Sequence, residues 1–366
     1  MLYYLPLEPY AERYTALMSC VDGWAEDNFK KRNISFVRID GDKLGTATIK
    51  DGVVLDACGR SYYAMSQIMK IVKLVHEGKI QDNDTIYVED FWHPGIESLF
   101  YVRHLTKIKF KIGTFIHAQS VDDTDFAYKM KDWMRPIEQG FGKQYDFIFT
   151  CSEILRNLCI DAGIASKNNI FTVGLPYNSS KLLQQIKNMG VNFPVRKEDF
   201  VLFCSRFDAE KDPMFFLDLC EACPDTKFVL VNPRKDRAIS NDNEVVKRLQ
   251  NNKPKNLEIV PTYKKKDYYQ LLARARIVFN CAHQDWVSWT LLEAITFHCI
   301  PLYPIWKDFP LELKNNPLYL YKKQDLQDAR QHLQHLMKMD FDDGLQYVVK
   351  KHDNSWNRYL EIMDIN

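Results

Sequence analysis

Short apolar runs alternate with longer segments of helical periodicity along this chain of 366 residues. Apolar positions recur at helical spacing over 62–76 and predict an amphipathic helix, whereas a compact run such as 35–39 predicts a strand. The first half is expected to hold strands at 2–5, 35–39, 85–88, 111–116 and 147–150, and helices at 17–31, 62–76 and 152–162. Strands that alternate with helices indicate a parallel sheet covered on both faces.

Turn-forming residues at 174–180 interrupt this alternation, and a second alternation follows them. Its expected strands are 199–204, 227–231, 257–260, 277–280 and 300–303, and its expected helices include 213–223 and 266–275. We therefore predict an α/β protein with two Rossmann-like, doubly wound domains that face a cleft. The expected domains are residues 1–180 and 181–345, followed by a C-terminal helix, 346–366, that packs back toward the first domain.

Composition narrows the function classes. The chain has 49 Lys and Arg against 48 Asp and Glu, and this net charge of +1 gives no general attraction to nucleic acid or anionic membrane. No apolar run is long enough to span a membrane, and the N-terminus lacks a basic, then apolar, signal sequence. The nine cysteines are scattered, as in a reducing, cytoplasmic setting. We expect Cys220 and Cys223 to pack at a helix end rather than to bind zinc.

Two cations follow the strand expected at 199–204. Arg206 and Lys211 stand on a strand-to-helix loop, where ligands of open parallel sheets bind. Two positive charges at such a place can neutralise a diphosphate. The alternative interpretation is a solvated loop in which these cations pair with acidic neighbours of the same loop.

Two carboxylates, Asp285 and Glu293, frame the start of an expected helix after the strand at 277–280. Ser288, Trp289 and Thr290 are expected in its first turn, where free backbone N–H groups and the positive helix end suit another face of a diphosphate. Glu293 is expected about one turn further in, pointing back to the cleft. The alternative for Glu293 is an exposed helix residue.

The pairing of Arg206 and Lys211 with Asp285-x7-Glu293 resembles the retaining nucleotide-sugar glycosyltransferases of the GT-B fold, over about residues 199–305. In that family the Arg and Lys hold the donor diphosphate, the first Glu of a Glu-x7-Glu motif contacts the donor sugar, and the second binds the ribose. The resemblance implies these roles for Arg206, Lys211, Asp285 and Glu293. It also implies an acceptor-binding first domain and a nucleotide-sugar-binding second domain.

The chain departs from the family pattern at two places. Asp285 is one methylene shorter than the usual Glu, so the backbone or the sugar must lie closer, or the contact with the sugar differs. The usual Gly-rich loop after the first strand is absent, and Glu8, Glu12 and Arg13 stand there instead. We expect these three residues to contact the acceptor, with an ordinary surface turn as the alternative.

Three further side chains follow strands of the first domain. His117 ends the strand at 111–116, and the resemblance implies that it contacts hydroxyls of the donor sugar; the alternative is a structural histidine. Trp92 and His93 come after the strand at 85–88 and are expected to stack on a ring of the acceptor. The alternative for both is a packed loop.

A basic group lies at 103–111. Lys107, Lys109 and Lys111 alternate, so on a strand they would share one face, and Arg103 precedes them. If they border the cleft, these residues would follow the phosphate backbone of a nucleic acid. The alternative is solvated surface charge.

The expected function is a glycosyltransferase, hexosyl or pentosyl, that moves a sugar from a nucleotide diphosphate to a hydroxyl, with retention implied by the resemblance. UDP-sugar is the expected donor. No tightly bound cofactor and no metal are expected, because Arg206 and Lys211 would replace the divalent ion. A loose resemblance to bacteriophage enzymes points to hydroxymethylated pyrimidines of double-stranded DNA as acceptor, in the host cytoplasm, without a membrane partner. The alternatives are a glycan or small-metabolite acceptor, or a non-catalytic nucleotide-sugar-binding protein.

Overall fold

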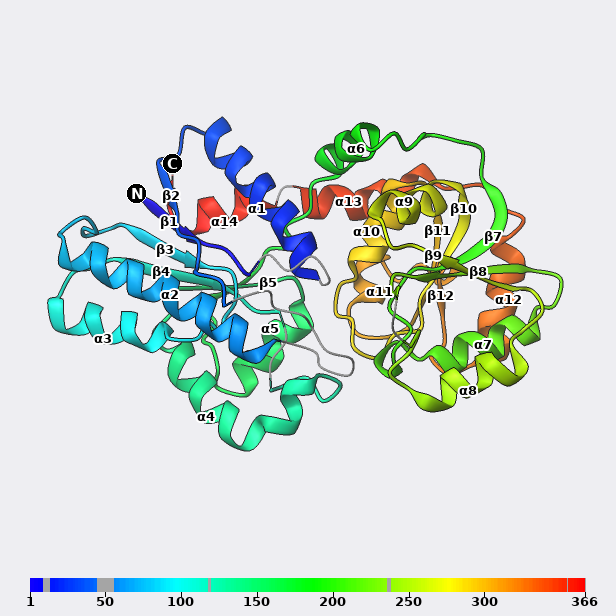
Figure 1. Ribbon diagram of the computed structural model, residues 1–366, viewed down its shortest axis with the longest axis horizontal. Coiled ribbons are helices and arrows are strands. Elements are labelled where there is room, and N and C mark those ends of the chain that lie inside the picture. Colours follow the sequence, from blue (N-terminus) through cyan, green and yellow to red (C-terminus); the bar gives the residue numbers. More distant parts are fainter. Residues whose placement is uncertain (9–13, 45–55, 118–119, 236–237, 354, 366) are drawn as a thin grey trace. The chain divides into compact units, whose positions relative to one another are not determined.

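The computed structural model describes residues 1–8, 14–44, 56–117, 120–235, 238–353 and 355–365. The chain divides into two compact units, each with its own parallel sheet (Figure 1). Unit 1 is Met1–Pro176 with Asn354–Asn366, and unit 2 is Tyr177–Asp353.

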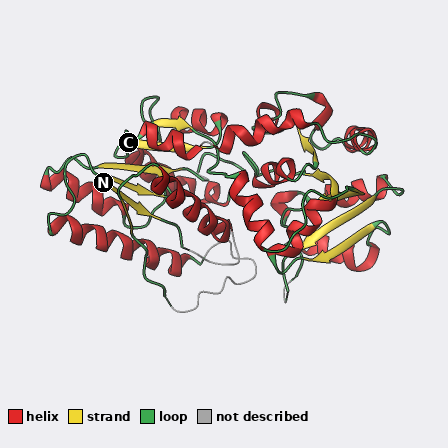
Figure 2. Ribbon diagram, turned by 90° about the horizontal axis from the view of Figure 1, so that it is seen from above, coloured by secondary structure: helices red, strands yellow, loops and turns green. Residues whose placement is uncertain are grey.

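Unit 1 contains a parallel sheet of six strands in the order β2-β1-β3-β4-β5-β6. The strands are β1 (Leu2–Leu5), β2 (Phe36–Arg38), β3 (Thr85–Val88), β4 (Lys111–Phe115), β5 (Phe147–Thr150) and β6 (Ile170–Thr172). The helices are α1 (Tyr14–Lys31), α2 (Ala57–His76), α3 (Ile96–Thr106), η1 (Phe126–Met130), α4 (Lys131–Gly142), α5 (Glu153–Asp161) and α14 (Ser355–Ile362). Figure 2 shows helices on both sides of the strands.

Local signals place these helices. Ser152 caps α5 by accepting a hydrogen bond from the Leu155 N–H at 2.9 Å, and Gly163 follows its end at a φ of 69°, so both expected boundary residues are confirmed. Helix α2 begins at Ala57, earlier than predicted, because Asp56 accepts a hydrogen bond from the Gly59 N–H and starts the helix there. Its first turn therefore contains Arg60.

Helix α14 completes the core of unit 1. Its Trp356 and Tyr359 side chains are buried against aromatic residues of the sheet: Trp356 lies 6.2 Å from Tyr4 and 5.9 Å from Tyr87, ring centre to ring centre. The Tyr359 hydroxyl donates to the Gly174 carbonyl at 3.1 Å. The C-terminal segment thus forms two helices, and the other one, α13 (Gln346–Asp353), belongs to unit 2.

Unit 2 contains a second six-stranded parallel sheet, in the order β12-β11-β10-β7-β8-β9. The strands are β7 (Glu198–Phe203), β8 (Lys227–Asn232), β9 (Leu257–Pro261), β10 (Ala275–Phe279), β11 (Ile300–Pro304) and β12 (Leu320–Tyr321). The main helices are α6 (Ser179–Asn188), η2 (Ala209–Lys211), α7 (Pro213–Ala222), α8 (Asn243–Asn252), α9 (Lys265–Arg274), α10 (Trp289–Thr296), α11 (Phe309–Glu312) and α12 (Leu326–Leu336). Two short turns, η3 (Pro317–Tyr319) and η4 (Asp343–Leu345), complete it.

The predicted fold class, α/β with two doubly wound parallel sheets, is confirmed. Cys220 and Cys223 are buried at the end of α7, as expected. In each sheet the chain order reverses once, between β1 and β3 in unit 1 and between β7 and β10 in unit 2. Ligands of such sheets bind outside the carboxyl ends of the strands at these switch points. A ligand site is therefore expected at the loops after β1 and β3 in unit 1 and after β7 and β10 in unit 2.

Candidate functional site

Lys211 and Asp285 form an ion pair at the switch point of unit 2. Lys211 follows β7, Asp285 follows β10, and the Lys211 ammonium donates to Asp285 Oδ1. The pair is largely buried, with side chains 10% and 19% exposed. Burial alone would raise the pKa of Asp285, but the Lys211 charge and hydrogen bond outweigh it and hold that pKa below its ordinary value. The structure therefore joins the two motif halves, 74 residues apart in sequence, through one charged contact.

Arg206 is half exposed on the same loop. Its guanidinium pairs with Glu210 at 2.7 Å and lies 3.8 Å from Asp208. This is the geometry of the alternative interpretation, in which acidic neighbours in the loop balance the cation. Asp208 is itself buried, and it accepts a hydrogen bond from the Asn241 N–H at 2.9 Å. Arg206 is thus positioned at the correct strand end, but its charge is shared with the loop.

The N-terminus of α10 presents unused donors beside this pair. Ser288 is the N-cap, yet its hydroxyl does not cap the helix; it lies 2.6 Å from the Thr290 hydroxyl instead. The Thr290 hydroxyl is also 3.1 Å from the Tyr303 hydroxyl. Within the described residues, the backbone N–H groups of Trp289 and Thr290 donate to no protein acceptor. Free N–H groups at a helix N-terminus form a ready anion site.

Glu293 is buried, so the alternative of an exposed helix residue is wrong. Its Oε2 accepts a hydrogen bond from the Tyr268 hydroxyl at 2.6 Å, and its Oε1 lies 3.3 Å from the Tyr269 hydroxyl. Burial raises the pKa of Glu293, and the two phenols offset part of that rise. The carboxylate oxygens keep further lone pairs for a hydroxyl donor. Sequence reasoning missed Tyr268 and Tyr269: their adjacent positions in α9 are visible in the sequence, but their contacts with Glu293 are not.

Unit 1 places a second charged cluster at its own switch point. Arg60 of α2 forms an ion pair with Asp90, lies 3.5 Å from a Glu8 carboxylate oxygen, and donates to the Trp92 carbonyl at 3.2 Å. Glu8 is 3% exposed, so its alternative as a surface turn residue is wrong. Burial favours a raised pKa for Asp90, but Arg60 outweighs it and lowers the pKa. Glu12 and Arg13 lie outside the described residues.

His117 and His93 stand beside this cluster. His117 Nε2 is 2.8 Å from the Glu89 carbonyl oxygen, a position from which a ring N–H donates to that carbonyl, and burial lowers the pKa of His117. Burial, with Arg60 nearby, lowers the pKa of His93 to about 4. His93 Nε2 is buried without a hydrogen-bond partner among the described residues. An unpaired buried acceptor is costly, which makes His93 a candidate to receive a ligand hydroxyl.

Trp92 is partly buried and packs against other aromatic rings. Its indole N–H donates to Glu138 at 3.0 Å, and its ring lies 5.9 Å from Trp133 and 5.7 Å from Phe141. These contacts hold the loop after β3 in place.

The basic group at 103–111 differs from the prediction. The expected shared strand face is wrong, because Lys107 ends α3 in the left-handed conformation and β4 begins only at Lys111. Lys109 therefore lies in a loop, and Arg103 is bound to Asp146 at 2.6 Å. These residues precede β4, whereas Asp90 and His93 follow β3. In a parallel sheet the two groups lie at opposite edges.

The described part of the chain has neither a cluster of metal ligands nor a helix suited to cross a membrane. No three His, Cys, Asp or Glu side chains there gather as metal ligands. Every helix described there is too short or too polar to cross a bilayer.

No protein-family model matches the chain, and no curated protein matches its sequence. Its fold does match solved structures. Sucrose-phosphate synthase from Thermosynechococcus elongatus aligns over 99% of this chain and 96% of its own, with a TM-score of 0.63 and 11% identity. A trehalose-6-phosphate synthase aligns over 99% and 98%, with a TM-score of 0.65 and 11% identity. HepE from Anabaena, solved with UDP and glucose, aligns over 99% and 97%, with a TM-score of 0.58 and 10% identity.

At this level of identity the similarity concerns the fold. The chain has the GT-B fold of these glycosyltransferases, with two six-stranded parallel α/β sheets in series.

Proposed function

We propose that this chain is a glycosyltransferase that moves a sugar from a nucleotide diphosphate to a hydroxyl acceptor. The observation that carries the proposal is the meeting of Lys211, Asp285 and the free N–H groups of α10 at the carboxyl edge of one sheet. Charge that develops on a departing diphosphate is stabilised best by such fixed donors and cations. The UDP in the HepE complex supports a UDP-sugar as the first donor to test.

The ion pair implies an exchange of partners when the donor binds. Without a donor, Asp285 balances Lys211. A diphosphate carries more negative charge than one carboxylate, so Lys211 would turn to the phosphates and Arg206 would join it from its exposed loop. Asp285 would then be released to accept hydroxyls of the transferred sugar. These two cations would neutralise charge as a divalent ion does in other transferases.

Glu293 would bind the nucleotide's ribose. Its carboxylate is fixed by Tyr268 and Tyr269, and it follows the helix turn that would hold the phosphates. A fixed, buried acceptor discriminates strongly against a ligand that lacks the matching hydroxyl.

The cluster in unit 1 would serve the transferred sugar and the acceptor. His117 would contact the sugar, as the family resemblance implies, and Glu8 and His93 would accept hydroxyl hydrogen bonds. Retention of configuration is proposed on the same resemblance, supported by the retaining reaction named for the trehalose-6-phosphate synthase.

For the acceptor we propose a sugar-containing molecule, a glycan or a small metabolite, in preference to DNA. Carboxylates and imidazoles gather at the switch point of unit 1, and they suit hydroxyls rather than phosphates. The basic residues that supported a hydroxymethylated DNA acceptor lie at the opposite sheet edge. Duplex binding whose affinity falls steeply with salt would restore the DNA acceptor.

The test is donor turnover. Purified protein is incubated with UDP-glucose, UDP-galactose and UDP-N-acetylglucosamine, with and without sugar acceptors, and released UDP is quantified. We expect slow UDP release with one donor, lost in Lys211→Ala and retained in Lys227→Ala. Lys227 is a matched control because it pairs with Glu258 on an exposed face at the start of β8. Nucleotide binding without release of UDP from any donor would favour the non-catalytic alternative.

A further inference from the structure

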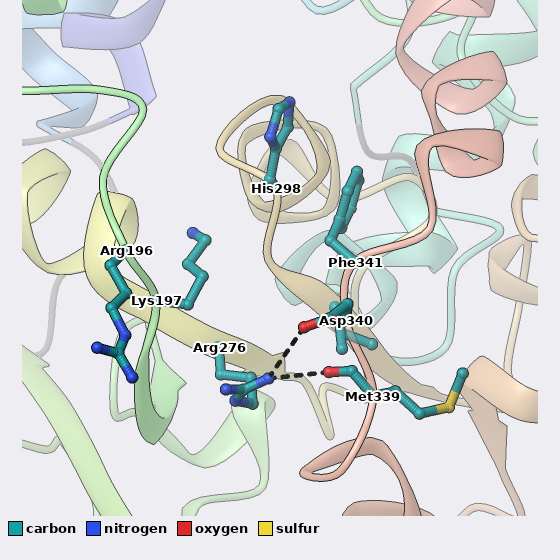
Figure 3. Close-up of a pocket in the computed structure, with 8 residues that line it drawn as sticks. Arg196, Lys197, Arg276, His298, Met339, Asp340 and Phe341 are labelled. Carbon is teal, nitrogen blue, oxygen red and sulfur yellow. Dashed lines mark hydrogen bonds and ion pairs between the residues drawn. The ribbon is translucent and has the colours of Figure 1, made fainter.

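Unit 2 holds a pocket at the edge of its sheet opposite the candidate donor residues. The pocket has a volume of about 300 Å³. Arg196 and Lys197 border it just before β7, Arg276 within β10, and His298 just before β11, as Figure 3 shows. All these positions lie at the amino-terminal ends of the strands. A strand of six residues such as β7 spans about 20 Å, so the proposed donor site makes no use of this pocket.

Two guanidinium groups in the pocket have donors to spare. Arg196 is exposed and makes no hydrogen bond or ion pair with any described residue. Arg276 donates from Nε to Asp199 at 2.7 Å and from Nη1 to the Met339 carbonyl at 2.9 Å, while its Nη2 has no acceptor in the described part of the chain. Asp199 and Asp340 are largely exposed to water, and so is Asp343, whose charge acts on His298; this exposure weakens their compensation of the cations.

Lys197 is a third cation that borders the pocket. Its ammonium donates to the Phe297 carbonyl at 2.6 Å and the Ala273 carbonyl at 2.9 Å, at the C-terminal ends of α10 and α9. Such a cation stabilises the negative ends of both helices, so it has a structural role of its own. No carboxylate of a described residue lies within ion-pair distance of it. The pocket is therefore cationic without a matching buried acid.

The opposite wall is aromatic and flat. The His298 ring stacks on Phe341, with ring centres 5.0 Å apart and planes 10° from parallel (Figure 3). Met339 also borders the pocket, on the side of Arg276. A volume of about 300 Å³ holds several water molecules. This is more than a single phosphate group fills, so the pocket leaves room for an organic part beside a phosphate.

We propose that this pocket binds a small organic phosphate, with its phosphate on Arg196 and Arg276 and its organic part against Met339 and Phe341. Guanidinium groups suit this role because their paired N–H groups match phosphate oxygens. The inference does not depend on the proposed transferase activity, since the pocket shares no residue with the donor site.

Isothermal titration calorimetry with ribose 5-phosphate tests the proposal, with ribose and inorganic phosphate as comparison ligands. We expect saturable binding of ribose 5-phosphate, weaker binding of inorganic phosphate, and none of ribose. Arg196→Gln should weaken binding at least tenfold and should fold normally, because Arg196 has no hydrogen-bond or ion-pair partner among the described residues to lose. Arg274→Gln is the matched control: this exposed arginine at the end of α9 pairs with Glu198 and does not border the pocket.

A second pair of measurements separates this pocket from the donor site. Lys211→Ala should keep its affinity for ribose 5-phosphate, and Arg196→Gln should keep its affinity for UDP. Loss of ribose 5-phosphate binding in Lys211→Ala would place the ligand on the donor site and overturn the proposal. So would unchanged binding in Arg196→Gln, or no saturation at about 10 mM, beyond the usual range for metabolites. Inorganic phosphate that binds as tightly as ribose 5-phosphate would contradict an organic ligand.

Discussion

Because Lys211 and Asp285 form a largely buried ion pair, Lys211→Met should destabilise unit 2 by an amount that can be estimated. The substitution preserves most of the side-chain volume but leaves a buried carboxylate with two remaining influences, the Asn280 amide at 3.5 Å and the charge of Arg206. Breaking a buried pair by removing one partner costs about 3–5 kcal/mol. Asp285 is 19% exposed and has some access to water, so we expect about 3 kcal/mol, the lower end of that range.

The cost should depend on pH. In the wild type the pKa of Asp285 is lowered, so the pair stabilises the fold above the carboxyl's unfolded pKa of about 3.9 and loses this effect as the pH falls through the folded value. Without Lys211, burial is the dominant influence and raises the pKa. The variant is then least stable relative to the wild type at neutral pH. The difference in stability shrinks as the pH falls and Asp285 takes up a proton.

Hydrogen–deuterium exchange of peptides from β7 and β10 measures this locally, without assuming that both units unfold together. A loss of about 3 kcal/mol speeds exchange more than 100-fold at about 1.4 kcal/mol per tenfold. Lys227→Met, which breaks an exposed pair with Glu258, should change the local stability measured by exchange by no more than about 1 kcal/mol. Equal effects in the two variants, or a Lys211→Met effect that does not shrink between pH 7 and about pH 4.5, would refute the reasoning.

Three other substitutions test neighbouring contacts. Glu293→Gln should preserve the fold but reduce the preference for UDP over 2′-deoxy-UDP to near unity in calorimetry, because the amide is a poorer acceptor for the ribose hydroxyl; a retained preference would exclude Glu293 from the ribose. Tyr268→Phe should destabilise unit 2 by about 1–2 kcal/mol in local exchange and raise the pKa of Glu293 further, since its 2.6 Å hydrogen bond is lost. Arg60→Gln should lower the local stability of β3 by about 3 kcal/mol and so speed exchange of its peptides, because Asp90 and Glu8 lose their shared cation. An unchanged exchange rate in β3 would show that the cluster does not stabilise the fold.

The fold was predictable because its signals are local. Helix α5 has a capping Ser152 and a terminating Gly163, and the strands are compact apolar runs between turn signals. Periodicity needs no knowledge of distant residues. It failed where a single residue changed the backbone course, as at Lys107, whose left-handed conformation ends α3 and keeps the following lysines off β4.

The candidate site was predictable only in part. Strand ends identified Lys211 and Asp285, but their mutual ion pair depends on strand order, which the sequence does not state. Arg60 lies on a helix and was missed because its role depends on two carboxylates, Glu8 after β1 and Asp90 after β3. Tyr268 and Tyr269 likewise gain meaning only when α9 is placed against α10. Such contacts are set by tertiary packing, which no spacing rule contains.

The most direct test of a donor site at the carboxyl edge of unit 2 is a calorimetric titration with UDP. Wild-type protein and Lys227→Ala should bind UDP with the same affinity, and Lys211→Ala should bind at least tenfold more weakly, a difference of about 1.4 kcal/mol or more. Equal affinity in all three proteins, or no binding to any, would contradict the account.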